Sequence, residues 1–207
     1  YDFAKAKTAY VFKTMVDPFI GKYSFVKVCS GVLKGDDVLY NADTDAEEKP
    51  GKLYTMSGNK PTEVSELFAG DIGAIAKLAN TRTGDTLSTK STQVTYAKTE
   101  YSVPYTYMKY TVNKKGDEDK VSQALARMTA EDVTLKVVND SENRQSLLYG
   151  MGDQHLEITA SKLAARYKVE ITLSTPKVAF RETIRKNSDV DMKYKKQTGG
   201  HGQFGAV

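Results

Sequence analysis

The chain has 207 residues, of which 40% are hydrophobic and 27% charged, with one cysteine and no tryptophan. This balance is typical of a globular protein in water and excludes collagen-like, mucin-like and wholly disordered classes. No stretch approaches the roughly 20 apolar residues of a membrane-spanning helix, and residues 1–5 lack the apolar core of a signal peptide. The single Cys29 cannot form an internal disulfide, and together with the missing signal core this predicts a cytoplasmic protein. We expect it to be monomeric and to have no membrane partner.

The net charge of +4 is concentrated near the C-terminal end of the sequence. Residues 176–207 contain seven basic and three acidic residues, so this segment carries +4 and residues 1–175 are neutral. Basic clustering of this kind is a common footprint of nucleic-acid contact. Taken alone, however, it is explained equally simply by a lysine-rich edge strand, in which charge discourages pairing with other edges.

Residues 1–90 are predicted to form a β-barrel. Short runs of alternating or β-branched residues are separated by Gly, Asn and Asp turn signals, with no amphipathic helix between them. The expected strands are residues 8–13, 24–30, 38–40, 52–54, 72–78 and 83–87. We interpret residues 43–47 as an acidic, solvated loop, because the calcium-loop pattern that they begin has Glu48 where it needs Gly.

Residues 91–102 form a polar linker, and residues 103–175 are predicted to fold as a second domain. Its elements alternate in the order β-α-β-β-α-β, which is the ferredoxin-like pattern of a sheet with helices on one face. The first helix, residues 117–130, carries an apolar stripe at i, i+3, i+4 and i+7. The second helix should follow residues 150–153, and Asp153 is expected to cap its N-terminus. The two apolar faces are Val121, Ala124, Leu125 and Met128, and then Leu156, Ala160, Leu163, Ala164 and Tyr167.

Residues 176–207 begin a third part that is too short to bury a core of its own. Its segment GHGQFG at residues 200–205 has the letters of a dinucleotide-binding loop, but no helix follows, so we reject that function. The chain also lacks the GxxxxGK[ST] phosphate loop, and His155 has no second histidine nearby to form a metal site. No catalytic constellation remains, and we expect no catalytic, cofactor or metal residue in this chain.

Four groups of motifs, taken in order, resemble the central part of bacterial elongation factor G, a translational GTPase that drives ribosomal translocation. Residues 17–36 and 58–87 resemble its second domain, and GMGDQHLE at residues 150–157 resembles the signature of its third domain. VAFRETI at 178–184 and QTGGHGQFG at 197–205 resemble the start of its fourth domain. The family usually has Glu at position 153, and the histidine at 201 replaces an expected arginine, which suggests a divergent paralogue.

The resemblance implies a multidomain β and α+β protein: a translation-factor β-barrel, a ferredoxin-like domain, and from residue 176 the first strands of a further domain. It implies that the chain is a non-catalytic piece of a longer protein, whose amino-terminal GTPase domain would bind GTP and Mg²⁺. The expected partners are that domain and the ribosome, through small-subunit RNA and proteins. The resemblance and the charge together give two sets of candidates. Ribosome or RNA contacts are assigned to Lys193, Lys195, Lys196, Gly200, His201 and Gln203, and an interdomain relay to Gly150, Met151, Gly152, His155 and Glu157.

Two alternatives stay open at this point. Tetracycline ribosomal-protection proteins share the same architecture. A stand-alone RNA-binding or assembly scaffold without a GTPase would also carry these motifs.

Overall fold

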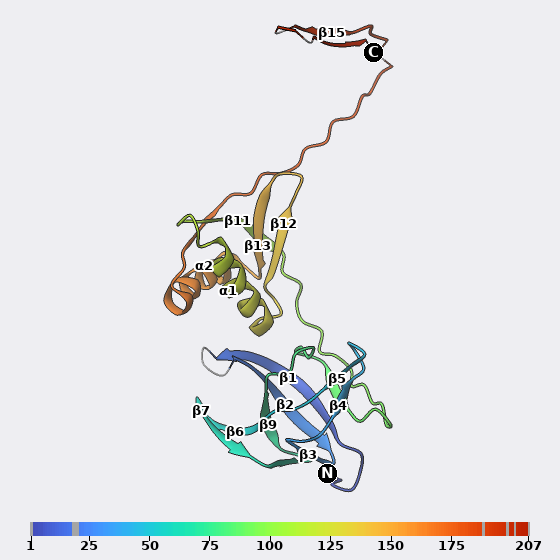
Figure 1. Ribbon diagram of the computed structural model, residues 1–207, viewed down its shortest axis with the longest axis vertical. Helices are drawn as coiled ribbons and strands as arrows, with labels where there is room; N and C mark the ends of the chain where they lie inside the picture. Colours follow the sequence, from blue (N-terminus) through green and yellow to red (C-terminus); the bar gives the residue numbers. More distant parts are fainter. Residues whose placement is uncertain (1, 18–20, 188, 198, 201, 207) are drawn as a thin grey trace. The chain divides into compact units, whose positions relative to one another are not determined.

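The computed structural model describes the chain except for residues 1, 18–20, 188, 198, 201 and 207. It divides into two units, Tyr1–Lys177 and Val178–Val207. The first unit contains a β-rich part followed by an α+β part (Figure 1). Within the described residues, no helix is both long and apolar enough to cross a bilayer.

The β-rich part is a curved sheet with a main apolar core and a smaller second cluster of buried apolar residues on β2, β6 and β9. Its strands are β1 (Thr8–Asp17), β2 (Gly21–Ser30), β3 (Val32–Lys34), β4 (Leu39–Asn41), β5 (Ala46–Glu48), β6 (Leu53–Ser57), β7 (Lys60–Val64), β8 (Glu66–Phe68), β9 (Ile72–Ala76) and β10 (Thr86–Ser88). Eight of them pair in the order β5-β4-β10-β1-β2-β9-β6-β7. The separate β3–β8 ladder contributes Leu33 and Leu67 to the same core.

Alternation explains how β2 builds this core. Val26 and Val28 are fully buried, while Lys27 between them points away from the core. Such two-residue periodicity is expected of a strand with one covered face. The barrel class is therefore confirmed, and the strands that the sequence did not reveal are the short β3, β5, β7 and β8.

The acidic segment at residues 43–47 is more ordered than predicted. Its second half enters β5, and the adjoining Glu48 is only 5% exposed. The Glu48 carboxylate accepts hydrogen bonds from the backbone N–H groups of Ala79 and Asn80 and from the Thr81 hydroxyl. A buried carboxylate is tolerated because these donors satisfy it. Residues 46 and 47 therefore belong to a strand rather than to the predicted loop, although Glu47 is exposed as expected.

The segment that we expected to be a linker is extended but tied to the barrel. Tyr96 donates its backbone N–H to the Thr86 hydroxyl at 2.9 Å, and its own hydroxyl lies 2.8 Å from the hydroxyl of Thr8. Lys98 Nζ is 2.9 Å from Asp43 and 3.3 Å from the buried Asp85. These contacts lead the chain along the barrel surface before the α+β part begins.

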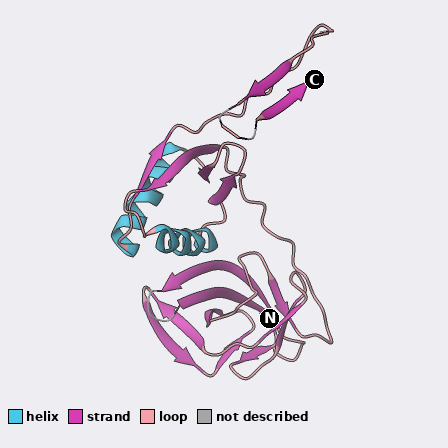
Figure 2. Cartoon of the chain, turned by 45° about the horizontal axis from the view of Figure 1, so that its top comes forward, coloured by secondary structure: helices cyan, strands magenta, loops and turns pink. Residues whose placement is uncertain are grey.

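The α+β part has the predicted order of elements. They are β11 (Thr106–Val112), α1 (Glu118–Glu131), β12 (Lys136–Asp140), β13 (Gln145–Gly150), α2 (Asp153–Lys162), the π-helical turn η1 (Leu163–Tyr167) and β14 (Ile171–Ser174). The sheet order is β12-β13-β11-β14 with every neighbour antiparallel. Both helices lie on one side of this sheet (Figure 2). The ferredoxin-like class is confirmed.

The predicted apolar stripes form the core between the helices and the sheet. Val121, Ala124, Leu125 and Met128 of α1 are buried against Leu148 of the central strand β13. From α2 and η1, Leu156 and Leu163 are fully buried. The sheet thus has one face covered by the helices.

The second unit is a two-stranded hairpin preceded by an extended segment. Its strands β15 (Lys193–Lys196) and β16 (Gln203–Ala206) pair antiparallel, with Lys195 opposite Phe204 and Lys196 opposite Gln203. All residues of both strands are exposed. As expected from its length, this unit has no buried core among its described residues.

Candidate functional site

The candidate site is built around the start of α2, where the chain leaves the central strand β13. A Cβ placed on Gly150 would lie 2.7 Å from Leu156 Cδ2 and 3.1 Å from His155 Nδ1. Only a glycine lets α2 approach the strand this closely. Gly152 precedes the helix as its N-cap, so Asp153 is the first helical residue and makes no capping bond. The predicted cap was therefore wrong, and Asp153 instead accepts a hydrogen bond from the Thr106 hydroxyl.

His155 joins the start of α2 to the end of α1. Its Nδ1 accepts the backbone N–H of Met151 at 3.1 Å, and its Nε2 lies 3.0 Å from Asp132 Oδ2. Because Nδ1 is an acceptor, the proton of the neutral ring is on Nε2, which donates to the carboxylate. Both ring nitrogens are thus engaged in holding two helix ends together, which leaves neither free to act as a general base.

Asp132 is held as a carboxylate by its surroundings. Partial burial pushes its pKa upward, but the hydroxyl and backbone N–H of Thr134, together with His155, outweigh it and lower the pKa below its usual value. Thr134 donates both bonds to Oδ1, at 2.5 and 2.9 Å. The residue therefore closes the end of α1 and orients His155 at the same time.

A second cluster connects the barrel strand β1 with both helical segments. Glu131, the last residue of α1, accepts the backbone N–H of Val16 at 2.7 Å. Arg166 of η1 makes a two-pronged contact with the same carboxylate, at 2.9 and 3.2 Å, and donates to the carbonyl of Val16 at 3.1 Å. The bond to Glu131 raises the pKa of the guanidinium, which stays charged. Fork-shaped pairing of this kind fixes direction as well as distance.

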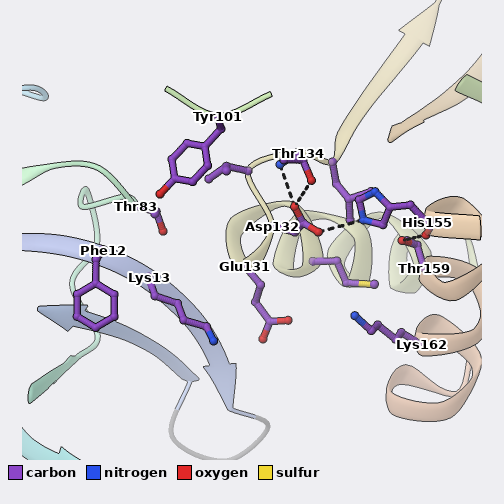
Figure 3. A pocket seen from close by; sticks show the side chains of 13 residues that line it. Phe12, Lys13, Thr83, Tyr101, Glu131, Asp132, Thr134, His155, Thr159 and Lys162 are labelled. Atoms are coloured by element: carbon purple, nitrogen blue, oxygen red, sulfur yellow. Dashed lines mark hydrogen bonds and ion pairs between the residues drawn. The ribbon is translucent and has the colours of Figure 1, made fainter. Parts of the chain in front are cut away.

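A cavity of about 500 Å³ lies next to these two clusters (Figure 3). Phe12 and Lys13 line it from β1, and His155, Thr159 and Lys162 line it from α2, with Glu131 and Asp132 between them. Figure 3 shows the bonds from Thr134 and His155 converging on Asp132. The described residues contain no group of three His, Cys, Asp or Glu side chains that could hold a metal ion. The hydrogen bonds and ion pairs beside the cavity connect β1, α1, α2 and η1 to one another.

The five relay candidates are only partly brought together. Gly150, Met151 and His155 form one connected group, and Gly152 begins the helix beside them. Glu157 lies exposed on α2 and makes no hydrogen bond or ion pair with any described residue. Glu131 and Arg166 escaped sequence reasoning, because neither belongs to a motif and 35 residues separate them.

The ribosome-contact candidates lie on the hairpin of the second unit. Since residues alternate between faces, Lys193 and Lys195 share one face, and Lys196 lies on the other with Gln203 opposite it. Gly200 adopts a left-handed conformation with φ of +61° in the connecting turn. His201 lies outside the described residues. The three lysines are therefore exposed but do not form one flat patch.

Comparison with known proteins gives consistent matches along the chain. Residues 6–90 match the family model "Elongation factor G domain 2", and residues 103–175 match "Elongation Factor G, domain III". The chain is also similar to a Thermus thermophilus protein of known crystal structure, with 33% identity and a TM-score of 0.79. That match covers 98% of this chain and 31% of the Thermus protein, so the chain spans about a third of that protein's length.

Proposed function

The chain belongs to the elongation factor G family, and from this premise we propose that it is the part of a translation factor that binds the ribosome and couples domains. The observation that carries the proposal is the match of residues 6–90 and 103–175 to an elongation factor G domain 2 and domain III, in that order. In this proposal a GTPase domain elsewhere in the same protein hydrolyses GTP with Mg²⁺, and these domains convert that event into movement on the ribosome during translocation.

No group among the residues that the structure describes fits the nucleotide or its metal. The sequence has no GxxxxGK[ST] loop to hold phosphates, and its described part has no cluster of metal-type ligands. The proposed contribution of these residues is therefore mechanical and electrostatic. It consists of binding RNA, keeping domains in register and passing displacement from one to the next.

The contacts at the end of α1 support the coupling role. Glu131 and Arg166 fasten β1 to the helical layer, while Asp132 and His155 fasten α1 to α2. At the end of α1, Glu131 thus contacts the barrel strand β1, and the next residue, Asp132, contacts α2. A displacement of β1, α1 or α2 would therefore shift the other two, because packed interiors transmit strain.

The lysine-rich hairpin supports the ribosome-binding role. Lys193, Lys195 and Lys196 are exposed, and each can neutralise one phosphate of ribosomal RNA. The test is to replace all three with Ala and measure ribosome affinity over a range of salt concentrations. We expect weaker binding and a smaller dependence of log K on log salt. An unchanged salt slope would refute the assignment, and Lys49→Ala, which changes an exposed lysine of the barrel, serves as the control.

A further inference from the structure

The four-stranded sheet of the α+β part has a second face that the helices do not cover. Met108 and Tyr110 of β11 pack toward the helices, so Tyr107 and Lys109 between them point to the opposite side. In the ladder, Tyr107 lies opposite Tyr149 of β13, and Tyr149 lies opposite Lys136 of β12. We call this side, carrying Tyr107, Lys109, Lys136 and Tyr149, the open face.

Two tyrosines form a stacked pair on the two central strands of the open face. The rings of Tyr107 and Tyr149 have centroids 4.8 Å apart and planes 21° apart. Tyr107 is 39% exposed, and Tyr105, just before β11, is 76% exposed. Neither hydroxyl of the pair makes a hydrogen bond to a described residue, and because the two rings stack on each other, each has only its other face left for a ligand.

Lysines flank this aromatic pair. Lys136 is the direct cross-strand neighbour of Tyr149, and Lys109 lies two residues beyond Tyr107 along β11. Neither lysine makes an ion pair or a hydrogen bond with any described residue. Their charge is therefore available to a ligand. The acidic residue of this face, Asp140, lies toward the other end, where Asn143 and Gln145 donate to it.

The far end of the open face is closed by the chain itself. Gln145 donates to the carbonyl of Lys177 at 2.8 Å and accepts its N–H at 2.9 Å, which holds the segment after β14 against the sheet. Leu147 on the same side is only 5% exposed. The accessible part of the face is thus the tyrosine end.

From this arrangement we propose that the open face binds single-stranded RNA. Tyr107 is exposed and Tyr149 is half-buried beside it. Aromatic rings on the two central strands of a four-stranded βαββαβ sheet can stack bases, and flanking lysines can contact the phosphates between them. From β12 to β11 the site spans about 10 Å, enough for two or three nucleotides. A protein partner fits less well, because the accessible end offers rings and unpaired lysines rather than aliphatic side chains.

The test measures binding of the 207-residue chain to a fluorescein-labelled ten-residue oligouridylate by fluorescence anisotropy. Replacing both tyrosines, Tyr107→Leu with Tyr149→Leu, should weaken binding at least about tenfold, since each stacked base contributes strongly to affinity. The isosteric pair Tyr107→Phe with Tyr149→Phe should bind within about twofold of the unchanged protein, because stacking needs the ring and not the hydroxyl. Equal affinity of the leucine and phenylalanine pairs would overturn the proposal.

Two further measurements keep the test decisive if the leucine pair fails to fold. Lys109→Gln with Lys136→Gln should reduce the salt slope by about 1.4, since each phosphate contact to a single strand contributes about 0.7. Photocrosslinking with 4-thiouridine RNA should label the peptides containing Tyr107 or Tyr149. An unchanged slope, crosslinks confined to residues 193–206, or no binding of the oligouridylate would each refute the inference.

The hairpin variant separates this proposal from the ribosome assignment of the lysine hairpin. With Lys193, Lys195 and Lys196 replaced by Ala, the sheet variants should still lower the remaining RNA affinity. If instead the hairpin variant abolishes all oligouridylate binding, the open face is not an RNA site, and the proposed ribosome contact by the hairpin is unaffected.

Discussion

Replacing Glu131 tests whether the barrel and the helical layer are held together as the contacts suggest. The Val16 N–H donates a hydrogen bond to the charged, largely buried carboxylate of Glu131, and we estimate that this bond contributes about 1.5 kcal/mol to stability. The pair with Arg166 has a guanidinium side chain that is 39% exposed, and solvent limits its value to about 0.7 kcal/mol. Glu131→Ala should therefore lower the free energy of unfolding by about 2 kcal/mol.

A double-mutant cycle with Arg166→Ala isolates the ion pair. Arg166→Ala should cost about 1 kcal/mol, and the double variant about 0.7 kcal/mol less than the sum of the two single changes, because the pair is lost in both. Urea unfolding followed by far-ultraviolet circular dichroism measures these values. Glu100→Ala and Arg127→Ala are the matched controls, since both residues are exposed and make no ion pair with a described residue. A coupling below about 0.3 kcal/mol, or a Glu131→Ala cost equal to that of Glu100→Ala, would refute the reasoning.

Three further changes test the local structure by the same unfolding assay. Gly150→Ala should destabilise the chain by about 1–3 kcal/mol, because the new Cβ would lie 2.7 Å from Leu156 Cδ2. Gly152→Ala is the control and should cost less than about 0.5 kcal/mol, because a Cβ there has no atom within 4 Å. Equal costs of the two changes would contradict the close-approach argument. Glu48→Gln should cost about 1–3 kcal/mol, because the amide nitrogen replaces one acceptor oxygen and leaves at least one of the three donors without an acceptor; a neutral result would show that the carboxylate is dispensable. Because the pKa of Asp132 is lower in the folded state, its contribution to stability, about 0.5–1 kcal/mol, is present above about pH 4 and is lost as the pH falls further. The difference in unfolding free energy between the unchanged protein and Asp132→Asn should therefore disappear in acid. A difference that grows as the pH falls would contradict the direction of the pKa shift.

The class of both folded parts was predictable because it depends on periodicity along the chain. The stripe from Val121 to Met128 and the alternation in β2 are local signals, and the structure buries those residues as expected. The family resemblance, which rests on motifs in order, is confirmed by both family models and by the Thermus structure. The assigned roles of the hairpin lysines and of the relay residues stay predictions.

What sequence reasoning missed depends on contacts between distant residues. The pattern of residues 43–47 predicts a solvated loop, yet the adjoining Glu48 is buried and its donors come from residues 79–81, more than 30 positions away. Asp153 looked like a helix cap by type, but the chain placed Gly152 in that position and turned Asp153 to Thr106. The π-helical turn at Leu163–Tyr167, which carries Arg166, leaves no signal in a pattern of apolar residues.

Glycine spacing gave a partial prediction of the relay site. It indicated a tight entry into α2 but not why Met151 and His155 accompany the glycines. The structure supplies the reason, since the Met151 N–H fixes the histidine ring and the ring then reaches Asp132 at the end of α1. Such a bond across 23 residues can be found only once both helices are in place.

The most direct test of the central claim is sedimentation of the 207-residue chain with purified ribosomes at low salt, where electrostatic binding is strongest. We predict that the chain sediments with the small subunit, that rising salt releases it, and that an excess of bacterial elongation factor G displaces it. A chain that stays in the supernatant at low salt, or that is not displaced by the factor, would contradict the account.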